Sequence, residues 1–226
     1  AGGEDDLVEG VLDLAAVGDD LQPAVGALVV AVLPSRSAQL ARPIALGVSL
    51  LTLVLGIVAT ATSFTRGSSE QFQMVERHDW IPQFGVSYAL GVDGISLALI
   101  LMALVLVPVC ILAAWDDVPE GGARHKGYFA LLLVLLPFMI GVFAATDVFL
   151  FYVAFEAMLI PMFLIIGIWG GKDRIYAAFK FFLYTLLGSV LMLVALIYLY
   201  LKGGSFQLAD LYALPLSARE QTWIFF

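Results

Sequence analysis

Two charged residues lie inside long apolar runs of this sequence, and their types could support proton chemistry. Glu156 is the ninth residue of the run VFLFYVAFEAMLIPMFLIIGIWG. A charge at that depth in a membrane costs about 2.5–3.5 kcal/mol, so such a residue is retained where it faces a partner or a polar cavity. A carboxyl group held between low dielectric and a nearby cation can bind and release a proton near neutral pH. The pattern favours proton transfer at Glu156; the alternative is a protonated residue that joins helices by a hydrogen bond.

Lys180 is the second charge inside an apolar run. It lies six residues after Arg174, about 9 Å along a helix axis. Tyr176, Lys180 and Tyr184 have the spacing i, i+4 and i+8, which places them on one helical face. Hydroxyl groups and an ammonium group can order water in a chain, so Lys180 is a second candidate for proton transfer. The alternative is that its long side chain extends back to the membrane surface.

Pro161 adds a polar backbone group close to Glu156. A proline has no N–H, so the carbonyl of Ala157 loses its helical hydrogen-bond partner. Pro108 and Pro137 have the same effect in the two preceding runs. Free carbonyls at membrane depth usually lie within protein or line water.

The sequence lacks the residues for other kinds of chemistry. The single cysteine, Cys110, excludes an intrachain disulfide and an iron–sulfur site, and we expect it to be a buried structural residue. His78 and His125 stand beside other charges, and we expect both to be solvated loop residues. The sequence shows no metal-ligand spacing, phosphate-binding glycine loop or nucleophile motif. We therefore expect this chain to bind no nicotinamide, flavin or iron–sulfur cofactor.

The elements that carry these residues are membrane helices. Hydrophobic residues make up 62% of the 226 residues and charged residues 13%, far from the balance of a soluble domain. A membrane helix needs about 20 mostly apolar residues. Five segments qualify: 43–63, 94–115, 127–146, 148–170 and 175–201. Weaker candidates lie at 21–34 and from 221 onward, and the expected total is about six membrane helices. The fold class is therefore all-α, a polytopic membrane helix bundle.

The two ends and the longest loop have their own character. Residues 1–20 hold seven acidic and no basic residues, so we expect a poorly ordered acidic segment followed by the helical bundle at 21–226. Most of the net charge of −8 lies in that segment and indicates no nucleic-acid partner. The loop 64–92 should form an extended or turned element, and Asp93 should cap the helix that follows it.

The short polar connections predict an orientation. Basic residues concentrate in the odd-numbered connections, which the positive-inside rule places in the cytoplasm, with the N-terminus outside. These residues are Arg36, Arg42, Arg124, Lys126, Lys172 and Arg174.

Three strings resemble one family of membrane proteins. They are WIPQFGVSYALGVDGISL (80–97), GVFAATDVFLFYVAFEAMLIPMFLIIGIWGG (141–171) and AAFKFFLYTLLGS (177–189). In this order they resemble subunit M of bacterial proton-pumping NADH:quinone oxidoreductase (complex I), whose mitochondrial equivalent is NADH dehydrogenase subunit 4. The resemblance covers about residues 22–226. The wider group includes other antiporter-like subunits and Mrp-type cation/proton antiporters.

The resemblance implies the N-terminal part of a fold of fourteen membrane helices with two inverted five-helix repeats. It implies that Glu156 is the family's fifth-helix glutamate, which pairs with a lysine of the seventh helix, and that Lys180 matches a sixth-helix lysine. Phe155 stands where the family often has Trp. Because the sequence stops at Phe226, where the seventh helix starts, we expect a fragment that is inactive in isolation.

The resulting hypothesis is a subunit of complex I in the bacterial plasma membrane, with other membrane-arm subunits, lipid and protons as partners. Its task would be proton translocation coupled to quinone reduction elsewhere in the complex. One alternative is a subunit of an Mrp-type cation/proton antiporter. Another is a non-catalytic membrane scaffold, in which Glu156 and Lys180 only join helices.

Overall fold

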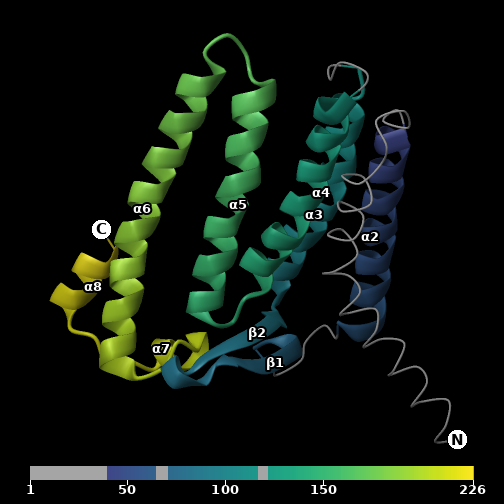
Figure 1. Cartoon of the computed structure of the whole chain (residues 1–226). Coiled ribbons are helices and arrows are strands. Elements are labelled where there is room, and N and C mark those ends of the chain that lie inside the picture. Colours follow the sequence, from purple (N-terminus) through teal and green to yellow (C-terminus); the bar gives the residue numbers. More distant parts are fainter. Residues whose placement is uncertain (1–39, 65–70, 117–121, 226) are drawn as a thin grey trace, which may run out of the picture.

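The computed structural model describes residues 40–64, 71–116 and 122–225 of the chain (Figure 1). The expected acidic segment at 1–20 and the weak helix candidate at 21–34 lie outside these residues. Among the residues described, five helices are long and apolar enough to cross a membrane. They are α2 (Ala41–Ser63), α3 (Gly94–Ala113), α4 (Gly122–Ala144), α5 (Val148–Trp169) and α6 (Arg174–Gly203). Each coincides with a segment predicted from run length, so the membrane-bundle fold class is confirmed.

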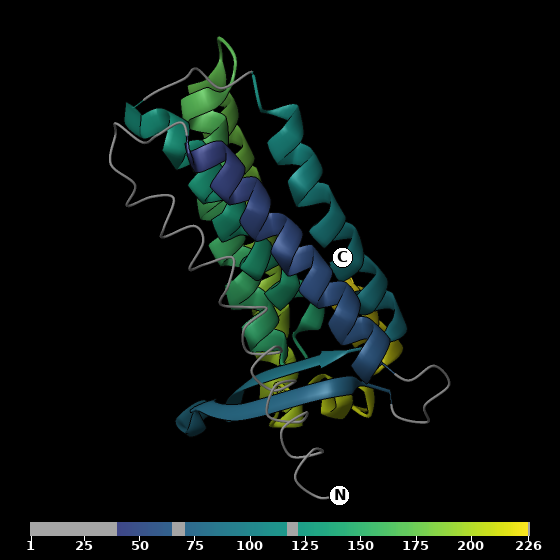
Figure 2. The ribbon, with the colours of Figure 1, turned by 90° about the vertical axis from the view of Figure 1, so that its right-hand side faces the viewer.

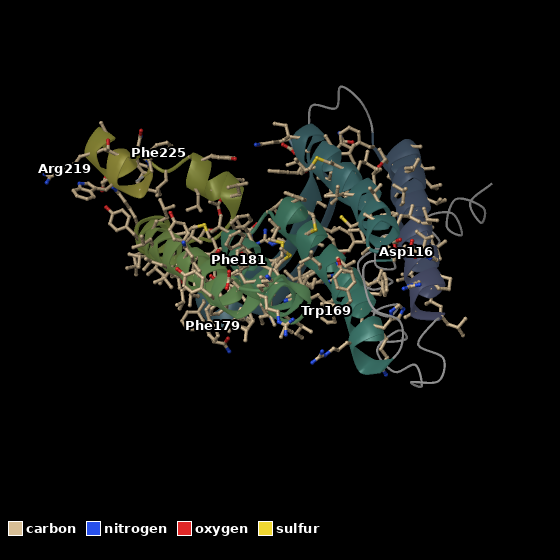
Figure 3. All side chains as sticks on the ribbon, turned by 90° about the horizontal axis from the view of Figure 1, so that it is seen from above. Asp116, Trp169, Phe179, Phe181, Arg219 and Phe225 are labelled. Carbon is tan, nitrogen blue, oxygen red and sulfur yellow. The ribbon has the colours of Figure 1, made fainter. Side chains whose placement is uncertain are left out.

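Helices α2, α3 and α4 share the main apolar core. Side chains that are almost fully buried meet between them, including Ala45 of α2, Leu104 and Ile111 of α3, and Phe129 and Leu133 of α4. Helix α5 packs on α4, and α6 packs on α5. Seen from above, Asp116 after α3 and Arg219 in the short helix α8 (Ala218–Phe225) lie on opposite sides of the bundle (Figure 3). Helix α5 therefore has protein on two sides, whereas much of α6 is exposed.

A β-hairpin lies across one end of the bundle (Figure 2). It consists of β1 (Gln73–Ile81), the 3-10 turn η2 (Pro82–Phe84) and β2 (Val86–Val92), with His78 opposite Tyr88 in antiparallel register. Gly85 adopts a left-handed conformation with φ of 64°, which suits glycine. The extended element expected in the 64–92 loop is this hairpin. Most of β2 is buried, and most of β1 is exposed.

The first turns of α3 and α5 are held by aspartates. The backbone N–H of Ser96 donates to Asp93 Oδ1 at 2.7 Å, and the N–H of Asp93 donates to Ser96 Oγ at 2.8 Å. This reciprocal pair is a capping box, as expected for Asp93. The Ser96 amide holds the pKa of Asp93 below its usual value. Asp147 caps α5 in a similar way.

The expectation for His125 was wrong. His125 is fully buried within α4, and its ring packs edge-on against Phe129 at 5.3 Å between centroids. The polar neighbours of His125 suggested a loop, but α4 begins before it and turns the ring into the α2–α4 core. His78 is exposed, as expected, but it lies in β1 and pairs with Glu76 at 3.0 Å.

Candidate proton-transfer site

Helix α5 places Glu156 near its middle. The helix begins at Val148 and runs unbroken to Trp169, through the buried Pro161. Glu156 is therefore its ninth residue, more than two turns from either end. One carboxylate oxygen, Oε1, is fully buried and has no hydrogen-bond partner among the residues that the structure describes. The sequence-predicted carboxylate thus lies at depth with an unsatisfied acceptor.

The helical stripe that holds Glu156 faces α6. Glu156, Phe163 and Gly167 are spaced at i, i+7 and i+11, so they share one side of α5. The ring of Phe163 lies 5.4 Å from the rings of both Phe179 and Phe182. A Cβ atom added at Gly167 would stand 3.6 Å from the Cβ of Ala178. The carboxyl group of Glu156 therefore belongs to the α5–α6 interface.

Tyr152 gives this interface a second polar side chain. It lies one turn before Glu156, and its hydroxyl group is near enough to the side chains of Glu156 and of Ser189 on α6 for an electrostatic interaction. Ser189 is 3% exposed, and its own hydroxyl donates to the carbonyl of Leu186 at 2.9 Å. Tyr152, Glu156 and Ser189 thus form a small polar cluster between two apolar helices. Only Glu156 was singled out by the sequence pattern.

Lys180 lies on the other side of α6. The buried residues of this helix, Ala178 and Ser189, mark the face toward α5. Lys180 follows Ala178 by two residues, which is about 200° around the helix, and it is exposed. Its ammonium group lies 5.8 Å from the ring centre of Tyr176. Lys180 therefore lies on the face of α6 that points away from Glu156, and the two side chains do not meet.

The predicted face with Tyr176, Lys180 and Tyr184 does exist, but it points out of the bundle. Tyr176 is 69% exposed and Tyr184 is 81% exposed. Nothing lies within 4 Å of a Cβ atom built on Gly188, which continues this face. An additional helix or a lipid chain could therefore lie directly against it.

Asp147 is a buried carboxylate that the sequence pattern did not single out. It is 0% exposed, and its oxygens accept hydrogen bonds from two amides of α5, one amide of β2 and the side chain of Gln207. The available signal was an Asp directly before an apolar run, which is typical of a helix cap. Its tertiary partners are distant in sequence and left no such signal.

The described charges divide between the two ends of the bundle. One end, called here the basic edge, carries five basic and two acidic residues: Arg42, Arg124, Lys126, Lys172, Arg174, Asp116 and Asp173. The opposite end, the hairpin edge, carries three basic and six acidic residues: Arg77, Lys202, Arg219, Glu76, Asp79, Asp93, Asp147, Asp210 and Glu220. Figure 1 shows the α5–α6 turn at one end and the hairpin with α7 (Leu208–Tyr212) at the other.

In the described part of the chain, no three His, Cys, Asp or Glu side chains are grouped so that they could hold a metal ion. Cys110 is a free thiol and is half-buried rather than fully buried. The site is therefore defined by one carboxyl group with a buried oxygen and by its hydroxyl neighbours.

Comparison with known proteins identifies the surrounding region. Residues 145–226 match the family model described as NADH:quinone oxidoreductase/Mrp antiporter, TM. This stretch begins just before α5 and includes the α5–α6 interface that holds Glu156. The model thus covers the part of the chain that carries the candidate site.

Curated relatives extend the similarity across most of the chain. Subunit M of NADH-quinone oxidoreductase from Rhodobacter capsulatus is 46% identical over 193 residues, which are 84% of this chain and 36% of the relative. NADH-ubiquinone oxidoreductase chain 4 from Chondrus crispus is 39% identical over 205 residues, which are 90% of this chain and 41% of the relative. The chain therefore spans about two fifths of the length of these relatives.

Solved structures agree with this assignment. Respiratory complex I from Thermus thermophilus contains a chain that superposes with a TM-score of 0.78 at 30% identity, covering 92% of this chain and 41% of that one. A chain of the Mrp complex from Dietzia sp. superposes with a TM-score of 0.69 at 19% identity, covering 94% and 22%, and shows the fold alone. The chain is a multi-pass membrane protein and belongs to the family of antiporter-like membrane subunits that includes subunit M of NADH:quinone oxidoreductase.

Proposed function

We propose that this chain is part of the membrane arm of respiratory complex I and takes part in proton translocation coupled to quinone reduction. The observation that carries the proposal is the buried Oε1 atom of Glu156 at the α5–α6 interface, which has no hydrogen-bond partner among the described residues. A buried acceptor without a partner costs about 1–3 kcal/mol. A carboxyl group can relieve this cost by taking up a proton or by binding water, and both events are steps of proton transfer.

Within this proposal, Glu156 is the residue that takes up and releases the proton. Tyr152 and Ser189 supply hydroxyl groups, which can both donate and accept, and extend the polar path toward α6. Lys180 acts from the outer face of α6 and adjusts the local field. The residues of this chain hold no redox cofactor in the proposal, so NADH, FMN, iron–sulfur clusters and quinone belong to other subunits.

The proposed setting is the bacterial plasma membrane, with other membrane-arm subunits as neighbours. The basic edge would face the cytoplasm, because basic residues are retained on that side of a membrane. The exposed face of α6 would lie against protein or lipid.

The decisive test is Glu156→Gln in the assembled complex. The amide keeps the shape of the side chain but cannot carry the proton, so proton translocation should fall by more than tenfold while assembly stays normal. The measurement is NADH-driven acidification of inverted membrane vesicles, with complex content checked by native electrophoresis. Glu76→Gln, the same change in the hairpin, is the matched control and should leave translocation intact. Normal translocation by an assembled Glu156→Gln complex would reduce this residue to a structural role.

A second candidate is a subunit of a cation/proton antiporter, because the family model is shared with Mrp antiporters and the Mrp chain has the same fold. That function predicts sodium-dependent proton exchange in the same vesicles without NADH. Exchange lost in Glu156→Gln, in vesicles with no NADH-driven acidification, would favour it over complex I.

A further inference from the structure

The two oxygens of Asp147 have different tasks. Oδ1 accepts hydrogen bonds from the backbone N–H groups of Phe149 at 2.9 Å and Leu150 at 3.2 Å, both in the first turn of α5. Oδ2 accepts from the backbone N–H of Ser87 in β2 and from the side-chain amide of Gln207, each at 3.1 Å. One oxygen therefore begins the helix, and the other joins it to two distant segments. We call Ser87, Asp147 and Gln207 the Asp147 clamp.

Backbone hydrogen bonds surround the clamp. The N–H of Val148 donates to the carbonyl of Phe206 at 3.0 Å, and the N–H of Leu208 donates to the carbonyl of Thr146 at 2.9 Å. On the other side, the N–H of Thr146 donates to the carbonyl of Ala89 at 2.9 Å. The start of α5 is therefore held between β2 and the segment that follows α6. Gln207 comes only four residues after the last residue of α6.

Asp93 shows what a cap alone requires. It lies at the same hairpin edge and caps α3, but its carboxylate accepts from the backbone N–H of Ser96, only three residues away. It is only partly buried, whereas Asp147 is 0% exposed. A cap needs neither full burial nor partners 60 residues distant. Oδ2 of Asp147 thus makes tertiary contacts that helix formation does not need.

We propose that Asp147 is a positioning residue for Glu156, which acts by fixing the start of α5 against the end of α6. This inference rests on the proposed role of Glu156. Glu156 follows Asp147 by nine residues, about 13.5 Å along the helix axis, and Tyr152 stands between them. The turn at 170–173 connects α5 to α6 at the basic edge. The clamp closes the pair at the hairpin edge.

Closure at both ends limits how far α5 can rotate or slide along α6. The electrostatic interaction of Tyr152 with Ser189 crosses the same interface, so it depends on the register between the two helices. A shift of about 1 Å in a reacting group can cost up to a hundredfold in rate. Release of the clamp should therefore change the surroundings of Glu156 without touching it.

Two clamp variants and one control test this inference. Gln207→Ala removes the link to the α6 side and leaves every contact of Oδ1 in place. Asp147→Asn can keep the cap through its remaining oxygen but presents an amide donor to the N–H of Ser87. Asp93→Asn makes the same chemical change in a helix cap without distant partners. All are made in the whole membrane-embedded protein, with Cys110 replaced by Ala.

The readouts follow geometry as well as activity. Spin labels at Ile160 of α5 and Leu187 of α6, which are 60% and 65% exposed, report the α5–α6 distance distribution. Infrared difference spectra against Glu156→Gln isolate the carbonyl stretch of the protonated Glu156 carboxyl, whose frequency depends on its hydrogen bonds. Both clamp variants should broaden or shift the distances, move the band and slow proton translocation about tenfold. Asp93→Asn should change none of these.

Unchanged distances and an unchanged Glu156 band in both clamp variants would overturn the inference and leave Asp147 as a helix cap. Equal effects of Asp93→Asn and Asp147→Asn would overturn it as well, because a general loss of stability would then explain both. Failure of the proposed function is separable: normal translocation by Glu156→Gln would remove the activity readout, while the distances would still report the clamp.

Discussion

At the scale of single residues, the buried Asp147 and the half-buried Glu156 have different hydrogen-bonding environments. Asp147 accepts hydrogen bonds from four N–H groups, two at each oxygen, so its position is fixed. Glu156 has an oxygen with no partner among the described residues. The structure thus separates a carboxyl group with hydrogen bonds to both oxygens from one with an unsatisfied oxygen.

Tyr152→Phe should slow proton translocation about tenfold without loss of assembly, because the ring stays and only the hydroxyl beside Glu156 is removed. The measurement is NADH-driven acidification of vesicles. Tyr184→Phe is the matched control, since its hydroxyl lies on the outward face of α6 and its side chain is 81% exposed. Equal rates in the two variants would show that the Tyr152 hydroxyl takes no part.

Lys180→Ala should lower the rate only partly, by a few-fold, since Lys180 lies on the face of α6 away from Glu156 and acts through a field that weakens with distance. Lys172→Ala, a lysine at the basic edge, controls for the loss of one positive charge. Complete loss of translocation in a well-assembled Lys180→Ala complex would assign Lys180 a direct role in proton transfer.

At the scale of elements, the α5–α6 turn depends on one of its two glycines. A Cβ atom at Gly170 would stand 2.4 Å from the carbonyl oxygen of Ile166 and 2.8 Å from the Cβ of Arg174, whereas one at Gly171 would meet nothing within 4 Å. Gly170→Ala should therefore destabilise the protein by about 1–3 kcal/mol, and Gly171→Ala should be close to neutral. Thermal unfolding in detergent measures both, and equal unfolding temperatures would contradict the steric argument.

The contact of α8 with α6 should persist in acid. Glu220 accepts hydrogen bonds from Lys202 and Tyr198 of α6 and from Ser217, which hold its pKa well below the usual range. A lowered carboxyl pKa stabilises the folded contact above the unfolded pKa, and this stabilisation is lost as pH falls through the folded pKa.

Hydrogen exchange of the 218–225 segment should therefore stay slow through about pH 4 to 5, where an ordinary glutamate titrates, and should rise only in stronger acid. Lys202→Ala removes the first contributor and should move the rise to higher pH. Release of the segment near the ordinary glutamate range in the unaltered chain would show that the network is not formed.

The elements were largely predictable, and the contacts between them were not. Run length against membrane thickness predicts α2 to α6 within a few residues, and the spacing of Asp93 and Ser96 is that of a helix cap. The position of His125 in the core, the partners of Asp147 and the outward direction of Lys180 depend on how helices pack. The middle of each of these helices is apolar on all sides, so the sequence gives little indication of which face is buried.

At the scale of the whole molecule, the division of charge between the two edges predicts accessibility. Single cysteines at positions 124 and 172, in a Cys110→Ala background, should react with a membrane-impermeant maleimide from the cytoplasmic side only. A cysteine at position 77 in the hairpin should react from the opposite side only. Labelling with the sides exchanged would reverse the proposed orientation.

The same division of charge has an electrical consequence. In the proposed orientation, the edge whose described residues include five basic and two acidic side chains faces the cytoplasm, and the edge whose described residues include three basic and six acidic side chains faces outward. Each elementary charge moved across a membrane potential changes the free energy by about 2.3 kcal/mol per 100 mV. A cell whose interior is negative therefore holds the bundle in this orientation through the potential itself. If the chain takes part in proton translocation as proposed, the gradient that translocation builds also opposes inversion of the protein.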